Sequence, residues 1–73
     1  MGQMSAEARQ ESIVDEVLVN GRVSVTALAE RHSVTVETIR RDLAVLDRAG
    51  ALRKIHGGAL PVAQTDREPS ILQ

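Results

Sequence analysis

Apolar residues recur at helical spacing in three stretches of this chain. The stripe nearest the N-terminus comprises Ala6, Ile13, Val14, Val17 and Leu18. Residues three or four positions apart lie on one face of a helix, so this stripe predicts a first helix with one buried side. Ser5 precedes it as a candidate N-cap. Asn20-Gly21 is expected to end it, because glycine readily adopts the left-handed conformation used at helix ends.

Two more helices are predicted at about residues 25–32 and 36–49, with Ser24 and Thr35 as N-caps and Gly50 closing the later one. The connection between them is only about three residues long, and two short helices joined so tightly must cross steeply, as in a helix-turn-helix. The residues expected to face the core in this part of the chain are Leu28, Ala29 and Val34.

The predicted third helix has two different faces when its residues are placed about 100° apart. The core-facing side holds Val36, Ile39, Leu43 and Leu46. The opposite side holds Glu37, Thr38, Arg41, Val45 and Arg48, with Arg40 and Asp42 on opposite flanks. A solvated surface helix has this pattern, and so does a helix that packs on a small core and presents arginine to DNA.

Two shorter runs predict a β-hairpin. Residues 51–55 and 59–62 are strand-like, and His56-Gly57-Gly58 lies between them. Glycines between two such runs are a hairpin signal, since tight hairpin turns need positive φ. The hairpin residues expected to pack against the helices are Leu52, Ile55 and Leu60.

The predicted order is helix, short strand at residues 22–24, helix, turn, helix and hairpin. This is the plan of a winged helix-turn-helix, a mostly α fold with three helices and a small β-hairpin as the wing. In such a fold the third helix enters the major groove and the wing lies along the backbone or the minor groove. A winged-helix protein-interaction module is the alternative that the pattern leaves open.

The distribution of charge favours DNA over that alternative. The net charge of the chain is only −1. Residues 1–30 carry a net −3, from Arg9 and Arg22 against Glu7, Glu11, Asp15, Glu16 and Glu30. Residues 31–58 carry a net +3, from Arg31, Arg40, Arg41, Arg48, Arg53 and Lys54 against Glu37, Asp42 and Asp47. A basic patch confined to one region is the electrostatic signature of a DNA-binding protein, and the overall charge conceals it.

Composition argues against several other classes of protein. The chain has no cysteine, and its two histidines, His32 and His56, are too far apart to suggest a zinc site. No apolar run approaches a membrane span and no signal-peptide pattern is present, so a cytoplasmic protein without metal or cofactor is expected. His56-Gly57-Gly58 is similar to an esterase oxyanion-hole motif, but the Gly-x-Ser-x-Gly nucleophile elbow is missing. No triad, carboxylate dyad or phosphate loop is recognisable, so we do not expect an enzyme.

Several motifs resemble those of the DeoR-type bacterial transcriptional regulators. They are Thr38-Ile39-Arg40-Arg41-Asp42-Leu43, Leu46-Asp47, Gly50 and His56-Gly57-Gly58-Ala59. The resemblance covers about residues 6–61, with the helix-turn-helix at about 23–42. Three positions depart from the family pattern. Thr35 replaces the usual Ser, Ser33 replaces a frequent Gly and should strain the turn, and Lys54 replaces a common Arg, which loses a bidentate fork.

The resemblance implies a DNA-binding N-terminal domain, joined by a linker to a larger effector domain that binds a phosphorylated sugar or related metabolite. Residues 62–73 are expected to be that linker, since Arg67-Glu68-Pro69-Ser70 is similar to the family's linker and Ile71 and Leu72 have nothing nearby to pack against. The family further implies a nucleoid-associated cytoplasmic protein, most often a repressor of sugar or carbon-source genes. It also implies a monomeric isolated domain and a homo-oligomeric full-length protein.

Candidate DNA contacts follow from the chemistry of the side chains. Arg41 can bond both acceptors of a guanine edge, Glu37 can accept from cytosine, and Thr38 lies beside them. Arg40, nearer the core flank, is expected to bind phosphate, as are Thr35 and Thr38 at the helix start. The candidate wing contacts are Arg53, Lys54, His56 and Gly57. Asp42 is expected to form an ion pair or hydrogen bond that orients a neighbouring arginine, and Arg48 to be solvated.

Overall fold

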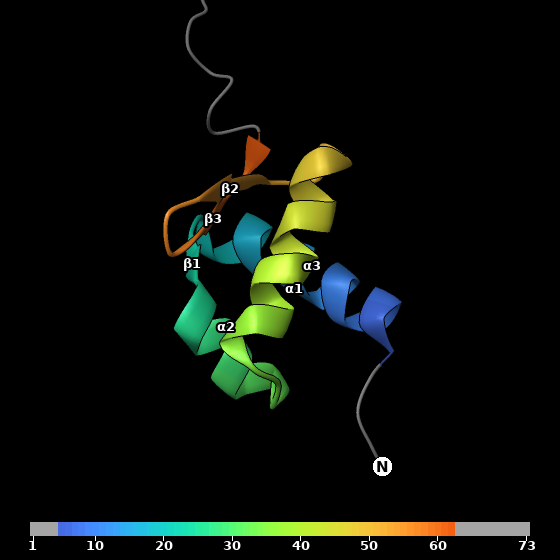
Figure 1. Cartoon of the computed structure of the whole chain (residues 1–73). Helices are drawn as coiled ribbons and strands as arrows, with labels where there is room; N and C mark the ends of the chain where they lie inside the picture. The colour runs from blue at the N-terminus through green and yellow to red at the C-terminus, as the bar shows by residue number, and fades with distance from the viewer. Residues whose placement is uncertain (1–4, 63–73) are drawn as a thin grey trace, which may run out of the picture.

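The computed structural model describes residues 5–62 and shows a winged helix-turn-helix, as predicted (Figure 1). The elements in chain order are α1 (Ala6–Asn20), β1 (Val23–Ser24), α2 (Val25–His32), α3 (Val36–Arg48), β2 (Arg53–Ile55) and β3 (Gly58–Leu60). All of the proposed linker except residue 62 lies outside the described residues. In the part of the chain that is described, no helix combines the length and apolar character needed to cross a membrane.

The ends of the helices are set by the predicted capping residues. The Ser5 hydroxyl accepts a hydrogen bond from the Ala8 N–H at 3.1 Å, and the Ser24 hydroxyl accepts one from the Ala27 N–H at 3.1 Å. Each of these bonds satisfies one of the N–H groups that the first turn of a helix leaves without an intrahelical partner. Gly21 has a φ of 83° and returns its N–H to the Val17 carbonyl, which closes α1.

One apolar core lies between the three helices and the sheet. Its largest fully buried side chains are Ile13, Val17, Leu28, Ile39, Leu43 and Leu52. The apolar stripe predicted for α1 is wrong at Ala6, which is exposed, and at Leu18, which is 61% exposed. The core contact of α1 is centred on Ile13 and Val17. Each helical residue is rotated by about 100°, so Leu18 points away from the core that Val17 enters.

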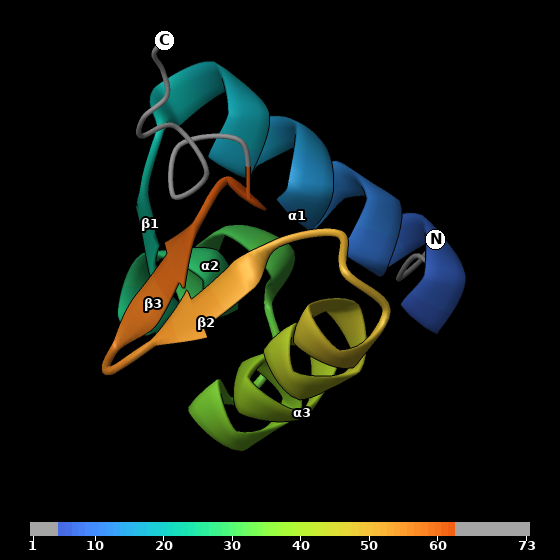
Figure 2. The same cartoon turned by 90° about the horizontal axis from the view of Figure 1, so that it is seen from above.

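The three strands form an antiparallel sheet in the order β1-β3-β2, so the two-residue strand β1 completes the sheet beside the hairpin (Figure 2). Ala59, at the centre of β3, is fully buried. Successive residues of a strand face opposite sides, so Leu60 is only half-buried, and Ile55 is half-buried as well. Of the hairpin residues expected in the core, Leu52 is therefore the one that is fully enclosed.

The turn between α2 and α3 is short and contains the strain expected of it. Ser33 adopts the left-handed conformation, with φ 58° and ψ 43°, and donates its N–H back to the end of α2. The Val34 N–H bonds the Ala29 carbonyl at 3.0 Å, and the half-buried Val34 side chain packs against the core. The two helices are thereby joined through residues 33–35 alone.

Candidate nucleic-acid interface

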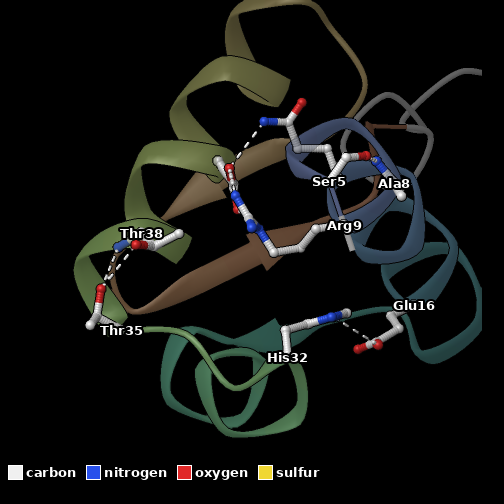
Figure 3. Close-up of polar contacts among 9 residues, drawn as sticks. Ser5, Ala8, Arg9, Glu16, His32, Thr35 and Thr38 are labelled. Carbon is white, nitrogen blue, oxygen red and sulfur yellow. Dashed lines mark hydrogen bonds and ion pairs between the residues drawn. The ribbon is translucent and has the colours of Figure 1, made fainter. Parts of the chain in front are cut away.

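The start of α3 is organised by two threonines (Figure 3). The Thr35 hydroxyl accepts a hydrogen bond from the Thr38 N–H at 3.1 Å, which caps the helix as predicted. The same hydroxyl donates to the Thr38 hydroxyl oxygen at 3.0 Å. Because Thr35 uses its only hydroxyl hydrogen in this bond, the hydrogen of Thr38 is the one directed to further acceptors. The structure thus favours Thr38 over Thr35 as the donor to a ligand at this helix end.

The outward face of α3 is charged and largely exposed, as the periodicity predicts. Ile39, Leu43 and Leu46 are buried against the core. The exposed residues of α3 are Glu37, Arg40, Arg41, Val45, Asp47 and Arg48, with Thr38 half-buried among them. An exposed helix bearing three arginines on a small scaffold has the width and charge to enter a DNA major groove.

Asp42 is the exception on this helix, because its side chain is only 5% exposed. Arg9, on α1, donates from Nε to Asp42 Oδ2 at 2.5 Å and from Nη2 to Oδ1 at 3.0 Å. Gln10 donates to Oδ1 at 3.0 Å. The predicted ion pair with an arginine is confirmed, and that arginine is Arg9. It comes from a different helix, 33 positions away in the sequence.

This set of contacts keeps Asp42 ionised. Burial by itself raises the pKa of Asp42, but the hydrogen bonds from Arg9 and Gln10, with the charges of Arg9 and Arg41, outweigh burial and hold that pKa below its ordinary value. The hydrogen bond to Asp42 in turn raises the pKa of Arg9, against the effect of burial. Both partners are charged at neutral pH, and their charges largely cancel within the protein.

The tip of the wing is held in place by its glycines. Gly57 has a φ of 81°, which glycine adopts without strain. A Cβ on Gly58 would lie 2.0 Å from the Val23 carbonyl oxygen, so only glycine allows β1 and β3 to pair at this point. The Gly57 carbonyl also accepts the Val25 N–H at 2.8 Å, which joins the wing to the start of α2. The His56-Gly57-Gly58 motif therefore has a structural role and is no oxyanion hole.

A groove of about 570 Å³ separates α3 from the wing. Its charged or titratable residues are Arg40 from the helix, and Lys54 and His56 from the hairpin. Its remaining residues are Val25, Leu43, Ile55 and Gly57. The groove thus combines an apolar floor with a cationic rim, which suits one strand of a polyanion.

The structure divides the predicted contact residues into two groups. Glu37, Thr38 and Arg41 lie on α3, and Thr35 is its N-cap. Arg40 also belongs to α3 but lines the groove with Lys54, His56 and Gly57. Arg53 is exposed at the start of β2. Arg22, which the sequence did not single out, lines a second hollow on the wing with His56 and Gly57. Its place beside the wing depends on the pairing of β1 with β3, for which a two-residue strand gives little sequence signal.

Arg9 and Gln10 are the other residues that the sequence analysis missed as part of this site. Nothing in the sequence around Arg9 indicates that its partner is Asp42. The one available signal was a charged residue, Asp42, next to the apolar positions of α3. A charge at such a position requires a partner.

Comparison with known proteins places the chain among transcriptional regulators. The family described as DeoR-like helix-turn-helix domain matches residues 9–65. The chain is 40% identical over 65 residues to the uncharacterized HTH-type transcriptional regulator YulB of Bacillus subtilis (strain 168), covering 89% of this chain and 25% of that protein. It is 43% identical over 56 residues to the lactose phosphotransferase system repressor of Streptococcus mutans, covering 77% of this chain and 22% of the repressor.

A third relative is named as an activator. The chain is 46% identical over 52 residues to the L-fucose operon activator of Haemophilus influenzae, covering 71% of this chain and 21% of the activator. The chain therefore spans a quarter or less of the length of these relatives. No solved structure matches the chain significantly.

Proposed function

Because this chain belongs to the DeoR family of bacterial transcriptional regulators and is a DNA-binding domain of that family, we propose that it directs the repression of genes for sugar metabolism. The domain is that of a regulator and not of an enzyme. The names of the lactose and fucose relatives support sugar genes as the target. Family membership also favours DNA over a partner protein as the ligand of α3.

The observation that carries the assignment of contacts is the exposed face of α3 beside the cationic groove. Arg41 lies on the exposed face and is proposed to bond a guanine edge, with Glu37 accepting from a neighbouring cytosine. Thr38 donates its free hydroxyl hydrogen to the DNA, and Thr35 orders the helix start, where the N-terminus favours a phosphate.

The groove and the wing are proposed to hold the DNA backbone. Arg40, Lys54 and His56 surround the groove, and a phosphate at this position is within reach of cations from both elements. Arg53 and the backbone at Gly57 extend this contact along the wing. A backbone held from two sides fixes the register in which α3 meets the base edges.

The remainder of the protein is proposed to supply the sensor. The chain spans less than a third of the length of the relatives that it matches, and we infer that residues 62–73 lead to a domain that binds a phosphorylated sugar. A single domain makes few contacts with DNA. Pairing of domains in a homo-oligomer would raise affinity through the effective concentration of the second domain.

The test of DNA reading is selection from a pool of randomised duplexes, followed by binding measurements at several salt concentrations. We expect one sequence to be enriched, and its affinity to fall as salt rises because counterions are released from phosphates. Amide signals of α3 and the wing should shift in an NMR titration with that duplex. The absence of any enriched sequence, even at low salt, would overturn the assignment.

The sugar assignment is tested on the full-length protein. We expect at least one sugar phosphate from a panel to release it from the selected duplex, whereas the 73-residue chain stays bound. Release of both by the same compound, or of neither by any member of the panel, would contradict a separate sensor for phosphorylated sugars.

A further inference from the structure

The contact between α1 and α3 includes a directional interaction within an otherwise apolar interface. Arg9 approaches Asp42 side-on, with Nε and Nη2 each bonded to a different carboxylate oxygen. Gln10 adds a third bond to the same carboxylate. Arg9 is 14% exposed and Asp42 is 5% exposed, so water screens this fork weakly. Among the ion-pairing side chains of residues 5–62, that of Asp42 is the least exposed.

The pair of hydrogen bonds from Arg9 to Asp42 restrains the rotation of α3 about its own axis, which apolar packing leaves largely free. Ile39 and Leu43 attach α3 to the core through contacts that are not directional, so they resist separation more than rotation. A planar guanidinium bonded to both oxygens of a carboxylate fixes the direction of approach as well as the distance. Asp42 is thereby held at one angle around the axis of α3.

That angle determines where the exposed side chains of α3 point. Arg41 precedes Asp42, and Thr38 lies about one turn before it, so a rotation at Asp42 moves both. Side chains extend roughly 5 Å from a helix axis, so a rotation of about 20° displaces their outer ends by about 2 Å. Hydrogen bonds to base edges tolerate only a fraction of that displacement.

We propose that Arg9 and Asp42 are positioning residues that set the rotation of α3 and thereby the sequence specificity of the domain. This inference rests on the proposed reading of DNA by α3. Neither residue touches DNA in this arrangement, because the carboxylate faces α1. Buried ion pairs contribute little net stability relative to well-packed apolar residues, so stability alone does not account for this pair, and orientation of α3 is the role that we assign to it.

The decisive variant replaces the whole ion pair by apolar residues of similar size, Arg9→Met with Asp42→Leu. No buried charge is left unpaired, so we expect a melting temperature equal to or above that of the wild type. Affinity for the duplex selected by the wild type should fall at least tenfold. Affinity for a scrambled duplex should stay within twofold, since the phosphate contacts remain.

Two further variants keep the test interpretable. Arg9→Lys retains the charge and loses the fork, so its loss of specific affinity should lie between those of the wild type and the double variant. Glu16→Gln is the matched control, because the carboxylate of Glu16 lies 3.4 Å from Arg31 and 3.6 Å from His32 and so links α1 to α2. It should leave the ratio of specific to scrambled affinity unchanged.

A direct readout of orientation accompanies the binding data. Amide relaxation dispersion should show new exchange broadening along α3 in Arg9→Lys and none in Glu16→Gln. Wild-type specificity in the double variant, or the same relaxation in Arg9→Lys as in the wild type, would show that the pair is merely structural. If the wild type itself selects no sequence, the proposed function fails and this inference fails with it.

Discussion

Arg40 and Arg41 are adjacent in α3 but meet different surroundings. Arg40 lines the groove opposite Lys54 and His56, where a strand of the DNA backbone is proposed to lie. Arg41 lies on the exposed face, about 100° further around the helix. The two arginines therefore have different proposed roles, and the difference comes only from their positions on the helix.

The two roles make different predictions for alanine substitution. Arg41→Ala should weaken binding to the selected duplex by about 1–3 kcal/mol and relax selectivity at one base pair. Arg40→Ala should weaken binding to all duplexes alike and reduce the slope of log affinity against log salt by about one. Binding to a panel of single-base variants at several salt concentrations separates the roles. A uniform loss in Arg41→Ala would make it a phosphate contact instead.

The two glycines of the wing are required for different reasons. Gly58 is needed for space, because any side chain would meet the Val23 carbonyl oxygen. Gly57 has open space around its Cβ position and is needed for its positive φ. Asparagine tolerates such a conformation better than other residues with side chains.

We therefore expect Gly58→Ala to lower the free energy of unfolding by about 1–3 kcal/mol, the usual range for forcing extra atoms into a packed site. Urea denaturation measures this loss. Gly57→Asn serves as the control and should be much better tolerated. Equal stability of the wild type and Gly58→Ala would mean that β1 and β3 can separate without loss.

At the scale of elements, the turn between α2 and α3 contains Ser33 at a position whose backbone conformation favours glycine. Ser33 occupies the left-handed region, which costs a residue with a side chain about 1–2 kcal/mol. Its N–H and that of Val34 nevertheless bond the last carbonyls of α2. The geometry of the turn is thus retained at some expense in stability.

Ser33→Gly should relieve that strain. Glycine loses about 0.5–1 kcal/mol more backbone entropy on folding, so the net gain in the free energy of unfolding is about 0.5–1 kcal/mol. Chemical denaturation tests this, with Ser33→Ala as a control that keeps the strain and should not be more stable than the wild type. A less stable Ser33→Gly would show that the serine makes a contact that outweighs its strain.

At this scale, the sequence could predict the features that depend on interactions between residues close together in the chain. The caps at Ser5, Ser24 and Thr35 act within three residues, and the two faces of α3 follow from helical periodicity, so the helices were predictable almost to the residue. The angle at which α1 meets the core is a tertiary property, and for that reason Leu18 was placed wrongly. The partner of Asp42 was likewise out of reach, because it comes from another helix.

The candidate site was likewise predictable where it depends on one helix and not where it depends on the packing of two elements. Arg41 and Thr38 follow from the exposed face of one helix. The convergence of Arg40 with Lys54 and His56 depends on how the hairpin packs beside α3, which no local pattern specifies. The DNA contacts of these residues stay predictions.

At the scale of the whole molecule, the internal ion pair strengthens the separation of charge. Arg9 belongs to the acidic N-terminal part and Asp42 to the basic part, and the two compensate each other inside the protein. The part of the chain from residue 31 to 58 thereby loses an acidic group from its surface. The positive potential around α3 and the wing is correspondingly stronger than the sequence charges indicate.

The same pair should make stability sensitive to acid. The pKa of Asp42 is lower in the folded state than in the unfolded chain, so its contribution is complete above about pH 4 and is lost as the pH falls toward the lowered value. One proton changes the free energy of unfolding by at most about 1.4 kcal/mol per pH unit. Urea denaturation of the wild type and Asp42→Asn between about pH 2 and pH 6 isolates this term, since the other carboxyl groups are common to both. The stability difference should shrink with acid, and a constant difference would contradict the linkage.

The acidic groups of α1 offer the complementary test, because they act on DNA only at a distance. Glu11 and Asp15 are exposed on α1 and line a hollow with Leu46 and Ala51, away from the proposed contact residues. We therefore expect them to lie about 10 Å or more from bound DNA, the width of a helix. The Debye length is about 30 Å at 0.01 M salt and 8 Å at 0.15 M, so their repulsion of DNA is felt mainly at low salt.

Glu11→Gln with Asp15→Asn should therefore raise the association rate several-fold at about 0.01 M salt and at most about twofold at 0.15 M. Stopped-flow fluorescence with the selected and scrambled duplexes measures both rates, and selectivity should not change. Glu37→Gln is the matched control on the reading face, where loss of the carboxylate should alter selectivity at either salt concentration. A rate gain in the α1 variant that persisted at 0.15 M would place Glu11 or Asp15 in contact with DNA, and the orientation of the domain on the duplex would have to be redrawn.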